Sequence, residues 1–251
     1  MVHFVGAGSG APDLITVRGK SYLEQADVII YAGSLVNPAL LADAKPRCEI
    51  FNSAKMTLEE IIAVMERAEK ENKLTVRLHT GDPCLYGAIR EQMDVLRRLG
   101  IAYDVCPGVS SFCGAAAALE AEYTLPGISQ SVVITRMAGR TPVPERESIR
   151  SFAAHGATMV IFLSTGLLQE LEAELQAGGY GADTPAAIVY KATWPDEKVL
   201  RCTVATLRET AERNGVRKTA LIVVGHCLGN SYDLSRLYAA DFSTEFREAT
   251  R

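Results

Sequence analysis

A short apolar run near the start of the chain leads directly into three closely spaced glycines. His3, Phe4 and Val5 precede the segment Gly6-Ala7-Gly8-Ser9-Gly10-Ala11-Pro12-Asp13, called loop 6–13 below. Glycine adopts positive φ freely and has no Cβ, so a buried strand that ends in such a segment can bring bare backbone up to a ligand. The pattern predicts a nucleotide-type binding loop at the end of a buried strand.

Loop 6–13 departs from the dinucleotide-binding fingerprint. Ala11 stands where that fingerprint has a third glycine, and Pro12 is expected to hold the chain in a loop rather than open a helix. The next predicted strand, residues 27–31, continues into Ala32-Gly33-Ser34 without the usual acidic residue at its end. These departures argue against a nicotinamide-dependent oxidoreductase. That function stays an alternative, as does a non-catalytic nucleotide-sensing module.

Composition narrows the class of protein. The chain has 251 residues and 48% apolar content, enough for one large domain or two small ones. A net charge of −4 and a pI near 5.7 argue against nucleic acid and anionic membranes as partners. No apolar run approaches the roughly 18 residues of a membrane span, and the start of the chain resembles a strand rather than a signal peptide. We therefore expect a cytoplasmic protein.

The cysteines are scattered singly and form no C-x-x-C pair. We expect reduced, mostly buried thiols, with no disulfide framework and no metal site. The six positions are Cys48, Cys84, Cys106, Cys113, Cys202 and Cys227.

The first half of the chain alternates strand and helix patterns, which predicts a mostly parallel sheet covered by helices. The segment Thr57-Leu58-Glu59-Glu60 is a capping box at the start of a long helix, because Thr57 and Glu60 can satisfy each other's free backbone amides. Predicted strands cover residues 4–5, 27–31, 74–78 and 102–105, and the other predicted helices cover residues 16–25, 90–99 and 112–119.

The second half has a different pattern, after a short linker at residues 123–127. Its predicted strands cover residues 132–135, 158–163, 186–190 and 220–224, with 199–202 as an antiparallel addition, and its predicted helices cover residues 167–177 and 204–214. The predicted fold class is therefore α/β, with two α/β domains at residues 1–121 and 127–251 and a ligand cleft between them.

Three glycine- or proline-containing breaks each follow a predicted strand at its carboxyl end. They are loop 6–13, residues 80–87 (loop 80–87) and residues 107–114 (loop 107–114). Ligands of open α/β sheets bind at this edge, beside the point where the strand order reverses. We expect the three loops to form one pocket. The alternative is that glycine and proline merely end the strands.

The same segments carry a family resemblance over nearly the whole chain. Residues 6–19, Thr80-Gly81-Asp82-Pro83 with Tyr86-Gly87, and Pro107-Gly108-Val109-Ser110-Ser111 resemble the tetrapyrrole (corrin/porphyrin) methylases. Residues 31–36, 52–57, 135–142 and 190–195 further resemble the C-11 methyltransferases of cobalamin synthesis, which act on precorrin-4 or its cobalt complex. The family's first motif is often Gly-Pro-Gly-Asp-Pro, from which this chain departs at Ser9 and Ala11.

The resemblance implies a two-domain homodimer that uses S-adenosylmethionine as methyl donor and a tetrapyrrole as substrate. A methylase of another ring carbon is the alternative within the family. Residues 34–38 and 52–55 favour the cobalt-containing substrate over the metal-free one. Asp82 is either an anion beside the sulfonium or a cap of the turn at Pro83. The cofactor contacts that the resemblance implies are Pro12, Gly81, Asp82, Tyr86, Ser110, Ser111, Leu163, Ala192 and the backbone from Ala220 to Ile222.

Four cations are candidates for binding the acetate and propionate groups of the substrate: Arg136, Arg140, Lys55 and Lys191. Arginine binds a carboxylate through two parallel hydrogen bonds, although an exposed arginine run is usually a solvated face. Trp194, the only tryptophan, either lines the tetrapyrrole or packs in the core.

No residue is identified as the catalytic base. His79 lies beside loop 80–87, but a histidine at the end of a strand is more often structural. His3, His155 and His226 are weaker candidates.

Overall fold

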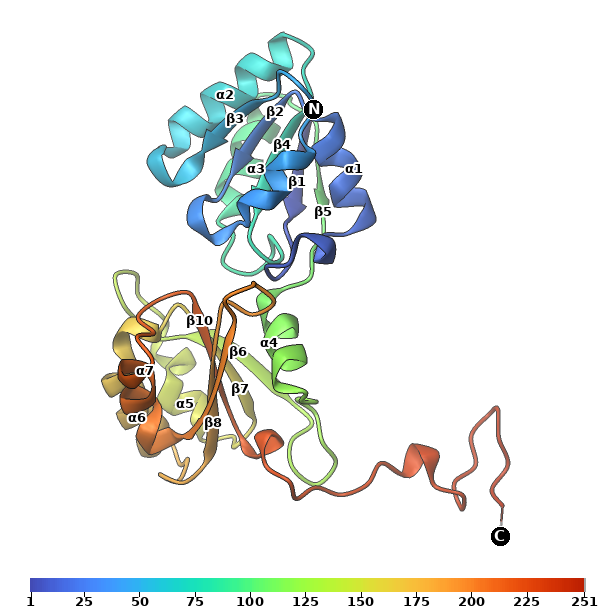
Figure 1. The fold of residues 1–251 in the computed structure, drawn as a ribbon, viewed down its shortest axis with the longest axis vertical. Coiled ribbons are helices and arrows are strands. Elements are labelled where there is room, and N and C mark those ends of the chain that lie inside the picture. Colours follow the sequence, from blue (N-terminus) through green and yellow to red (C-terminus); the bar gives the residue numbers. More distant parts are fainter. Residues whose placement is uncertain (251) are drawn as a thin grey trace. The chain divides into compact units, whose positions relative to one another are not determined.

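The computed structural model describes residues 1–250, which form two compact units (Figure 1). The first unit comprises Met1–Ala115 and Lys191–Glu197, and the second comprises Ala116–Tyr190 and residues 198–250. The units therefore divide inside helix α4 (Ser111–Leu119) rather than at residues 121–127. A continuous helix offers no loop signal in the sequence, and only spatial contacts assign Lys191–Glu197 to the first unit.

The first unit contains a five-stranded sheet in the order β3-β2-β4-β1-β5. All its neighbouring strands pair in parallel, as predicted. The short strand β3 is the one that the sequence pattern does not predict, because its four residues are half-exposed at an edge. The strands are β1 (Val2–Gly6), β2 (Val28–Tyr31), β3 (Glu49–Asn52), β4 (Thr75–His79) and β5 (Tyr103–Cys106).

Side chains alternate between the two faces of this sheet, and each face has its own apolar cluster. Val5 of β1 packs in the cluster that contains Leu23 of α1 (Val17–Gln25). The adjacent Phe4 packs in the cluster of α2 (Leu58–Lys70) and α3 (Ile89–Arg98). The sheet is therefore the middle of three layers, and its carboxyl edge stays available to loops.

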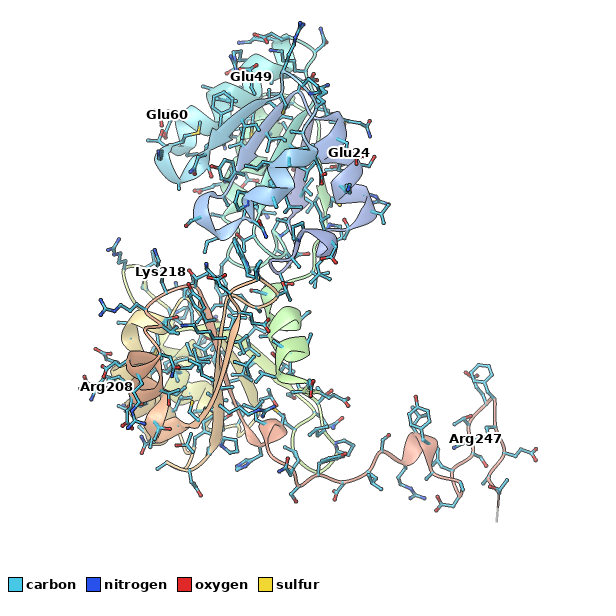
Figure 2. The ribbon with its side chains drawn as sticks, in the orientation of Figure 1. Glu24, Glu49, Glu60, Arg208, Lys218 and Arg247 are labelled. Carbon is cyan, nitrogen blue, oxygen red and sulfur yellow. The ribbon has the colours of Figure 1, made fainter. Side chains whose placement is uncertain are left out.

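The starts of the first helices are fixed by their caps. Thr16 caps α1 by accepting the amide proton of Gly19 at 3.0 Å. The predicted capping box of α2 is confirmed, because Thr57 accepts from the amide of Glu60 while the Glu60 carboxylate accepts from that of Thr57. Figure 2 labels the Glu60 side chain on α2. The expectation for Pro12 is wrong in detail. Pro12 begins a single 3₁₀ turn, Pro12–Leu14, because its fixed φ suits the first helical position.

The second unit contains a mixed sheet in the order β6-β7-β10-β8-β9. β6 and β7 pair in parallel, whereas the other neighbours pair antiparallel. The predicted antiparallel addition of residues 199–202 is therefore confirmed as part of β9. The strands are β6 (Val132–Arg136), β7 (Thr158–Phe162), β8 (Pro185–Tyr190), β9 (Lys198–Thr203) and β10 (Ala220–Val224).

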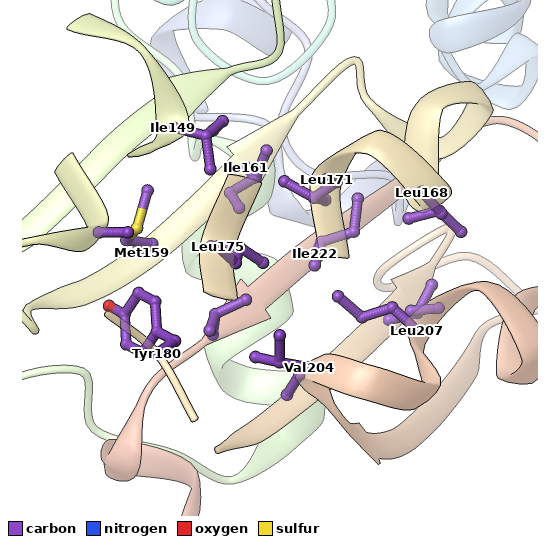
Figure 3. Packing of buried hydrophobic residues seen from close by; sticks show 14 of the residues in the cluster. Ile149, Met159, Ile161, Leu168, Leu171, Leu175, Tyr180, Val204, Leu207 and Ile222 are labelled. Carbon is purple, nitrogen blue, oxygen red and sulfur yellow. The ribbon is translucent and has the colours of Figure 1, made fainter. Parts of the chain in front are cut away.

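One large apolar cluster joins this sheet to the helices α5 (Ile149–Ala153), α6 (Leu168–Ala177) and α7 (Leu207–Arg213) (Figure 3). Ile161 of β7 and Ile222 of β10 are fully buried in it together with Leu171 of α6. α5 has five residues and is too short to produce a helical pattern in the sequence. The packing holds β7 and β10 side by side as the centre of the sheet.

All six thiols are free, and their burial corrects one expectation. Cys106 and Cys227 are buried, but Cys84, which lies in the loop after β4, and Cys113, which lies in the first turn of α4, are exposed. Within residues 1–250, no helix is both long enough and apolar enough to cross a membrane. The same part of the chain has no cluster of three or more side chains suited to holding a metal ion.

Candidate cofactor site

The three loops predicted to form one site follow three adjacent strands, β4, β1 and β5. Gly8 and Gly81 exchange backbone hydrogen bonds, with N···O distances of 3.3 and 2.9 Å. The carboxylate of Asp82 accepts the amide proton of Gly108 at 2.9 Å. Loops 6–13, 80–87 and 107–114 therefore contact one another at the carboxyl edge of the sheet, as expected from the topology.

Gly6 and Gly10 pack closely against other parts of the chain. A Cβ on Gly6 would lie 2.6 Å from both the Cα of Gly108 and the carbonyl oxygen of Gly81. A Cβ on Gly10 would lie 2.1 Å from the ring of Trp194. Glycine is required at these positions because other parts of the chain approach the backbone closely. That loop 6–13 also offers bare backbone to a ligand stays a prediction.

Gly81 lies against the first turn of α4. Its φ is +61°, and a Cβ there would lie 3.3 Å from the amide nitrogen of Ser111. The neighbouring Ser110 is buried, and its carbonyl accepts the amide proton of Cys113 at 3.0 Å. Because any L side chain at Gly81 strains the backbone, a valine there would not separate loss of ligand from loss of loop geometry.

Asp82 links two loops with its two carboxylate oxygens. One oxygen accepts the amide proton of Cys84 at 2.8 Å across the turn at Pro83, and the other accepts that of Gly108. Burial alone would raise the pKa of Asp82, but these hydrogen bonds outweigh it and lower the pKa below its usual value. The geometry favours the capping interpretation of Asp82, with an added bond to loop 107–114.

A buried polar cluster lies at the end of β4. The guanidinium of Arg77 donates to Gln92 and to the carbonyl of Ile30, each at 3.1 Å, and burial lowers its pKa to about 10. The Nε2 atom of His79 and the hydroxyl of Thr80 are buried and have no hydrogen-bond partner among residues 1–250. Burial, followed by repulsion from Arg77, lowers the pKa of His79 to about 3.

His79 is therefore neutral near pH 7, weakly basic and only 3% exposed, which makes it a poor candidate for the base. His3 is also engaged, because its ring stacks on Tyr22 and its Nδ1 lies 2.7 Å from Asp104. His155 and His226 are exposed in the second unit.

Lys191–Glu197 contributes two further predicted residues. Ala192 is buried, and its carbonyl oxygen would lie 2.7 Å from a Cβ on Gly10. The ammonium of Lys191 lies 2.6 Å from the carboxylate of Asp196 and 5.2 Å from the ring centroid of Trp194. Lys191 therefore already has an anionic partner, and Trp194 packs against loop 6–13.

The other predicted residues of the first unit are exposed. Pro12 starts the 3₁₀ turn at the end of loop 6–13, and Lys55 ends the turn Ser53–Lys55. Tyr86 is 46% exposed and has a φ of +56°, an unusual conformation for a tyrosine.

The predicted cofactor residues of the second unit differ in accessibility. Leu163 follows β7 with a φ of +53° and is 66% exposed, so its apolar side chain is presented to the surroundings. The carbonyl of Ala220 accepts from the Thr165 hydroxyl at 3.3 Å. The side chain of Ile222 is fully buried in the core, and β10 is paired on both sides.

Arg136 and Arg140 lie at the carboxyl end of β6. The guanidinium of Arg136 donates to the carbonyls of Met137, Thr141 and Pro142, at 3.1, 3.2 and 2.9 Å. These hydrogen bonds hold together the loop that follows β6, residues 137–142. Arg140 is exposed in that loop.

The sequence analysis missed two residues near the predicted site. Arg77 occupies a strand position where an apolar residue is the rule, which is a signal for a buried polar cluster. Thr193 has no such signal, because its contacts with Ser9 and Ala11 join residues more than 180 positions apart.

A profile of the Tetrapyrrole (Corrin/Porphyrin) Methylases matches residues 1–208. The chain belongs to this family of methylases. It is 51% identical to a cobalt-precorrin-4 C(11)-methyltransferase of Methanocaldococcus jannaschii, over 99% of this chain and 96% of the relative. The corresponding enzyme of Priestia megaterium is 46% identical over 100% and 98% of the two chains.

Solved structures agree with the family assignment. The X-ray structure of a cobalt precorrin-4 methyltransferase, a cobalamin biosynthetic enzyme, is 48% identical and has a TM-score of 0.89, covering 91% of this chain and 96% of that one. A uroporphyrin-III C-methyl transferase of Thermus thermophilus, complexed with S-adenyl homocysteine, is 26% identical with a TM-score of 0.74, covering 91% and 93%. The α/β fold and the methylase assignment predicted from the sequence are confirmed.

Proposed function

We propose that this methylase transfers the methyl group of S-adenosylmethionine to carbon 11 of cobalt-precorrin-4. The observation that carries the proposal is the 51% identity to a cobalt-precorrin-4 C(11)-methyltransferase over 99% of the chain. Identity falls to 31% for a uroporphyrinogen-III C-methyltransferase of Bacillus subtilis, which disfavours another ring carbon. The oxidoreductase and sensing-module alternatives are not retained, because the chain belongs to the methylases.

The cobalt-containing substrate is the finer part of the proposal. Two relatives named for cobalt-precorrin-4 are 51% and 46% identical, whereas two named for precorrin-4 are 44% and 42% identical. The difference in sequence identity is small, but it favours the same substrate as residues 34–38 and 52–55.

The described residues fit the chemistry of S-adenosylmethionine. The first turn of α4 offers amide donors and the positive end of a helix dipole, which suit the carboxylate of the methionine part. Gly81 lies beside this turn without a Cβ. Asp82 is ionised at neutral pH and contributes a negative charge near the same loops, favourable to a cation. We retain Pro12, Gly81, Tyr86, Ser110, Ser111, Leu163, Ala192 and Ala220 as proposed contacts, with Asp82 in a bracing role.

The protein's contribution to methyl transfer is positioning. When bound, S-adenosylmethionine supplies a methyl group that is already activated by its sulfonium. The ring carbon forms the new bond to this methyl group with its own π electrons, and the electron pair of the broken sulfur–methyl bond stays on sulfur. Alignment of two bound reactants can contribute up to roughly 7–11 kcal/mol to catalysis. The interlinked loops 6–13, 80–87 and 107–114 provide a rigid frame for that alignment.

The substrate's carboxylates require cations on a chain whose net charge is −4. We propose Arg140 and Lys55 as direct partners because both are exposed. Arg136 would act by closing the loop that carries Arg140, and Lys191 would have to exchange Asp196 for a substrate carboxylate.

A homodimer and a cytoplasmic location remain predictions. Light scattering tests the predicted homodimer.

The decisive experiment incubates the purified chain with S-adenosylmethionine and either cobalt-precorrin-4 or precorrin-4 in the absence of oxygen. We expect the mass of one added methyl group on the cobalt-containing ring, located at carbon 11 by a ¹³C-labelled methyl donor. Preference for the metal-free ring would overturn the cobalt assignment alone. Methylation at another carbon, or none on either ring, would overturn the proposed function.

A further inference from the structure

The hydroxyl of Thr193 joins two distant parts of the first unit. It accepts the amide proton of Ala11 at 2.9 Å and lies 3.1 Å from the hydroxyl of Ser9. Thr193 belongs to the segment Lys191–Glu197, while Ser9 and Ala11 belong to loop 6–13. We call these two hydrogen bonds the Thr193 clasp.

The backbone at the clasp has an uncommon conformation. The φ of Thr193 is +67° and that of Lys191 is +48°. Positive φ is strained for a β-branched residue and persists only where the surroundings impose it. The amide of Thr193 donates to the carboxylate of Glu197 at 2.6 Å, so this hydrogen bond joins two residues within the segment Lys191–Glu197. The segment is thus held in a shape that its own residues disfavour.

The clasp packs closely against Gly114 of α4. A Cβ on Gly114 would lie 2.7 Å from the Cβ of Ser9 and 3.4 Å from the Cγ2 of Thr193. On the other side of loop 6–13, the Asn37 amide group donates to the carbonyl of Gly10 at 2.9 Å. Loop 6–13 is therefore fixed from two directions, and one of them is Thr193.

Thr193 adjoins Ala192, and the clasp ends at Ala11, next to Pro12. Both Ala192 and Pro12 are proposed cofactor contacts. We propose that Thr193 is a positioning residue for S-adenosylmethionine, whose hydroxyl sets the relative placement of Ala192 and loop 6–13. This inference rests on the proposed function. It also gives Ser9 and Ala11, the two departures from the family's common motif, a shared structural partner.

The test replaces Thr193 with valine, which keeps the β-branched shape and removes the hydroxyl. We expect the dissociation constant of S-adenosylhomocysteine, measured by calorimetry, to rise about tenfold, because the amide of Ala11 loses its acceptor. Thr193→Ser retains the hydroxyl and is expected to bind within about twofold of the wild type. Thr206→Val is the matched control. Its hydroxyl makes similar bonds to Thr203 in the second unit, so its removal should not affect binding.

Trp194 gives a readout that needs no ligand. It is the only tryptophan of the chain and packs against Gly10, so its emission reports the contact between the segment and loop 6–13. We expect Thr193→Val to shift this emission to longer wavelength and to increase its quenching by acrylamide. Thr193→Ser and Thr206→Val should retain the wild-type emission.

Kinetics separate positioning from a purely structural role. Positioning predicts a raised KM for S-adenosylmethionine with nearly unchanged kcat in Thr193→Val. A purely structural role would lower the folded fraction and the melting temperature and leave KM unchanged. If Thr193→Val fails to fold, Ser9→Ala, which removes one of the two bonds, should show a smaller rise in KM.

The outcomes distinguish this inference from the proposed function. Wild-type affinity and wild-type Trp194 emission in Thr193→Val would overturn the positioning role while leaving the proposed function intact. A wild-type protein that binds neither S-adenosylmethionine nor its demethylated product would overturn both. Unchanged KM in both Thr193→Val and Ser9→Ala would also reject the role of the clasp.

Discussion

The carboxylate of Asp82 accepts the amide proton of Gly108 at 2.9 Å, so one side chain joins the loops that follow β4 and β5. Its second oxygen accepts the amide proton of Cys84 at 2.8 Å within its own loop. Asp82 therefore fixes the geometry of loop 80–87 and its distance from loop 107–114, whichever ligand binds there.

Asp82→Asn tests this brace. The amide side chain retains one acceptor oxygen, so either Cys84 or Gly108 loses its partner. We expect about tenfold weaker binding of S-adenosylhomocysteine, the consequence of one unsatisfied backbone donor. Calorimetry measures the change, and Asp183→Asn, on an exposed residue of the second unit, serves as the control. Equal affinities of Asp82→Asn and wild type would contradict the bracing role.

His79 predicts a specific dependence of stability on pH. Its pKa is lowered by burial from 6.5 to about 3, so below pH 6.5 the unfolded chain takes up a proton that the folded chain does not. Folding stability is therefore lost as the pH falls from 6.5 toward 3. Between pH 6.5 and 5, His79 alone should lower the free energy of unfolding by about 2 kcal/mol.

His79→Phe removes this proton uptake while filling a similar volume. Denaturant titrations of both proteins at pH 7.5 and pH 5 give the difference between their unfolding free energies, and the difference should move in favour of the variant at pH 5. A difference that does not change with pH would show that His79 titrates normally and is not buried as described.

Gly6→Ala tests the contact between the loops. The new Cβ would lie 2.6 Å from the backbone of both Gly108 and Gly81, which cannot move without shifting two loops. We expect a loss of about 1–3 kcal/mol in the free energy of unfolding, typical of overpacking. Gly166→Ala is the control, because a Cβ there meets nothing within 4 Å. Similar stabilities of the two variants would refute the requirement for glycine at position 6.

Arg136→Lys separates two roles for this arginine. Lysine keeps the charge but cannot donate to the carbonyls of Met137, Thr141 and Pro142 together. If Arg136 closes the loop, Arg136→Lys and Arg136→Ala should both raise the KM of the tetrapyrrole about tenfold and leave the affinity for S-adenosylmethionine unchanged. Retention of the wild-type KM by the lysine variant alone would assign Arg136 a direct role as a charge.

Arg140→Ala is the complementary test of direct substrate binding. Arg140 is exposed in the same loop, so its loss should raise the KM of the tetrapyrrole about tenfold or more without affecting folding. Steady-state kinetics and a thermal melt measure the two effects. Unchanged kinetics in Arg140→Ala would show that this arginine belongs to a solvated face and would direct attention to Lys55.

Local signals in the sequence determined the main elements of both sheets and the capping box at Thr57. The alternation of apolar strands with helical patterns predicted a parallel first sheet, because such strands need covering helices on both faces. The breaks after β1, β4 and β5 predicted where the loops would gather. These features depend on residues close together in the chain, so a local pattern suffices to reveal them.

Tertiary structure alone decided what the loop residues do. The glycines at positions 6 and 10 are needed because Gly108 and Trp194 approach them, and Thr193 reaches Ala11 across 182 positions. The lowered pKa of His79 likewise results mainly from burial in the folded unit, which its neighbours in sequence do not reveal. Contacts between distant residues are set by how the strands are ordered in the sheet, and that order brings together groups that no local pattern relates.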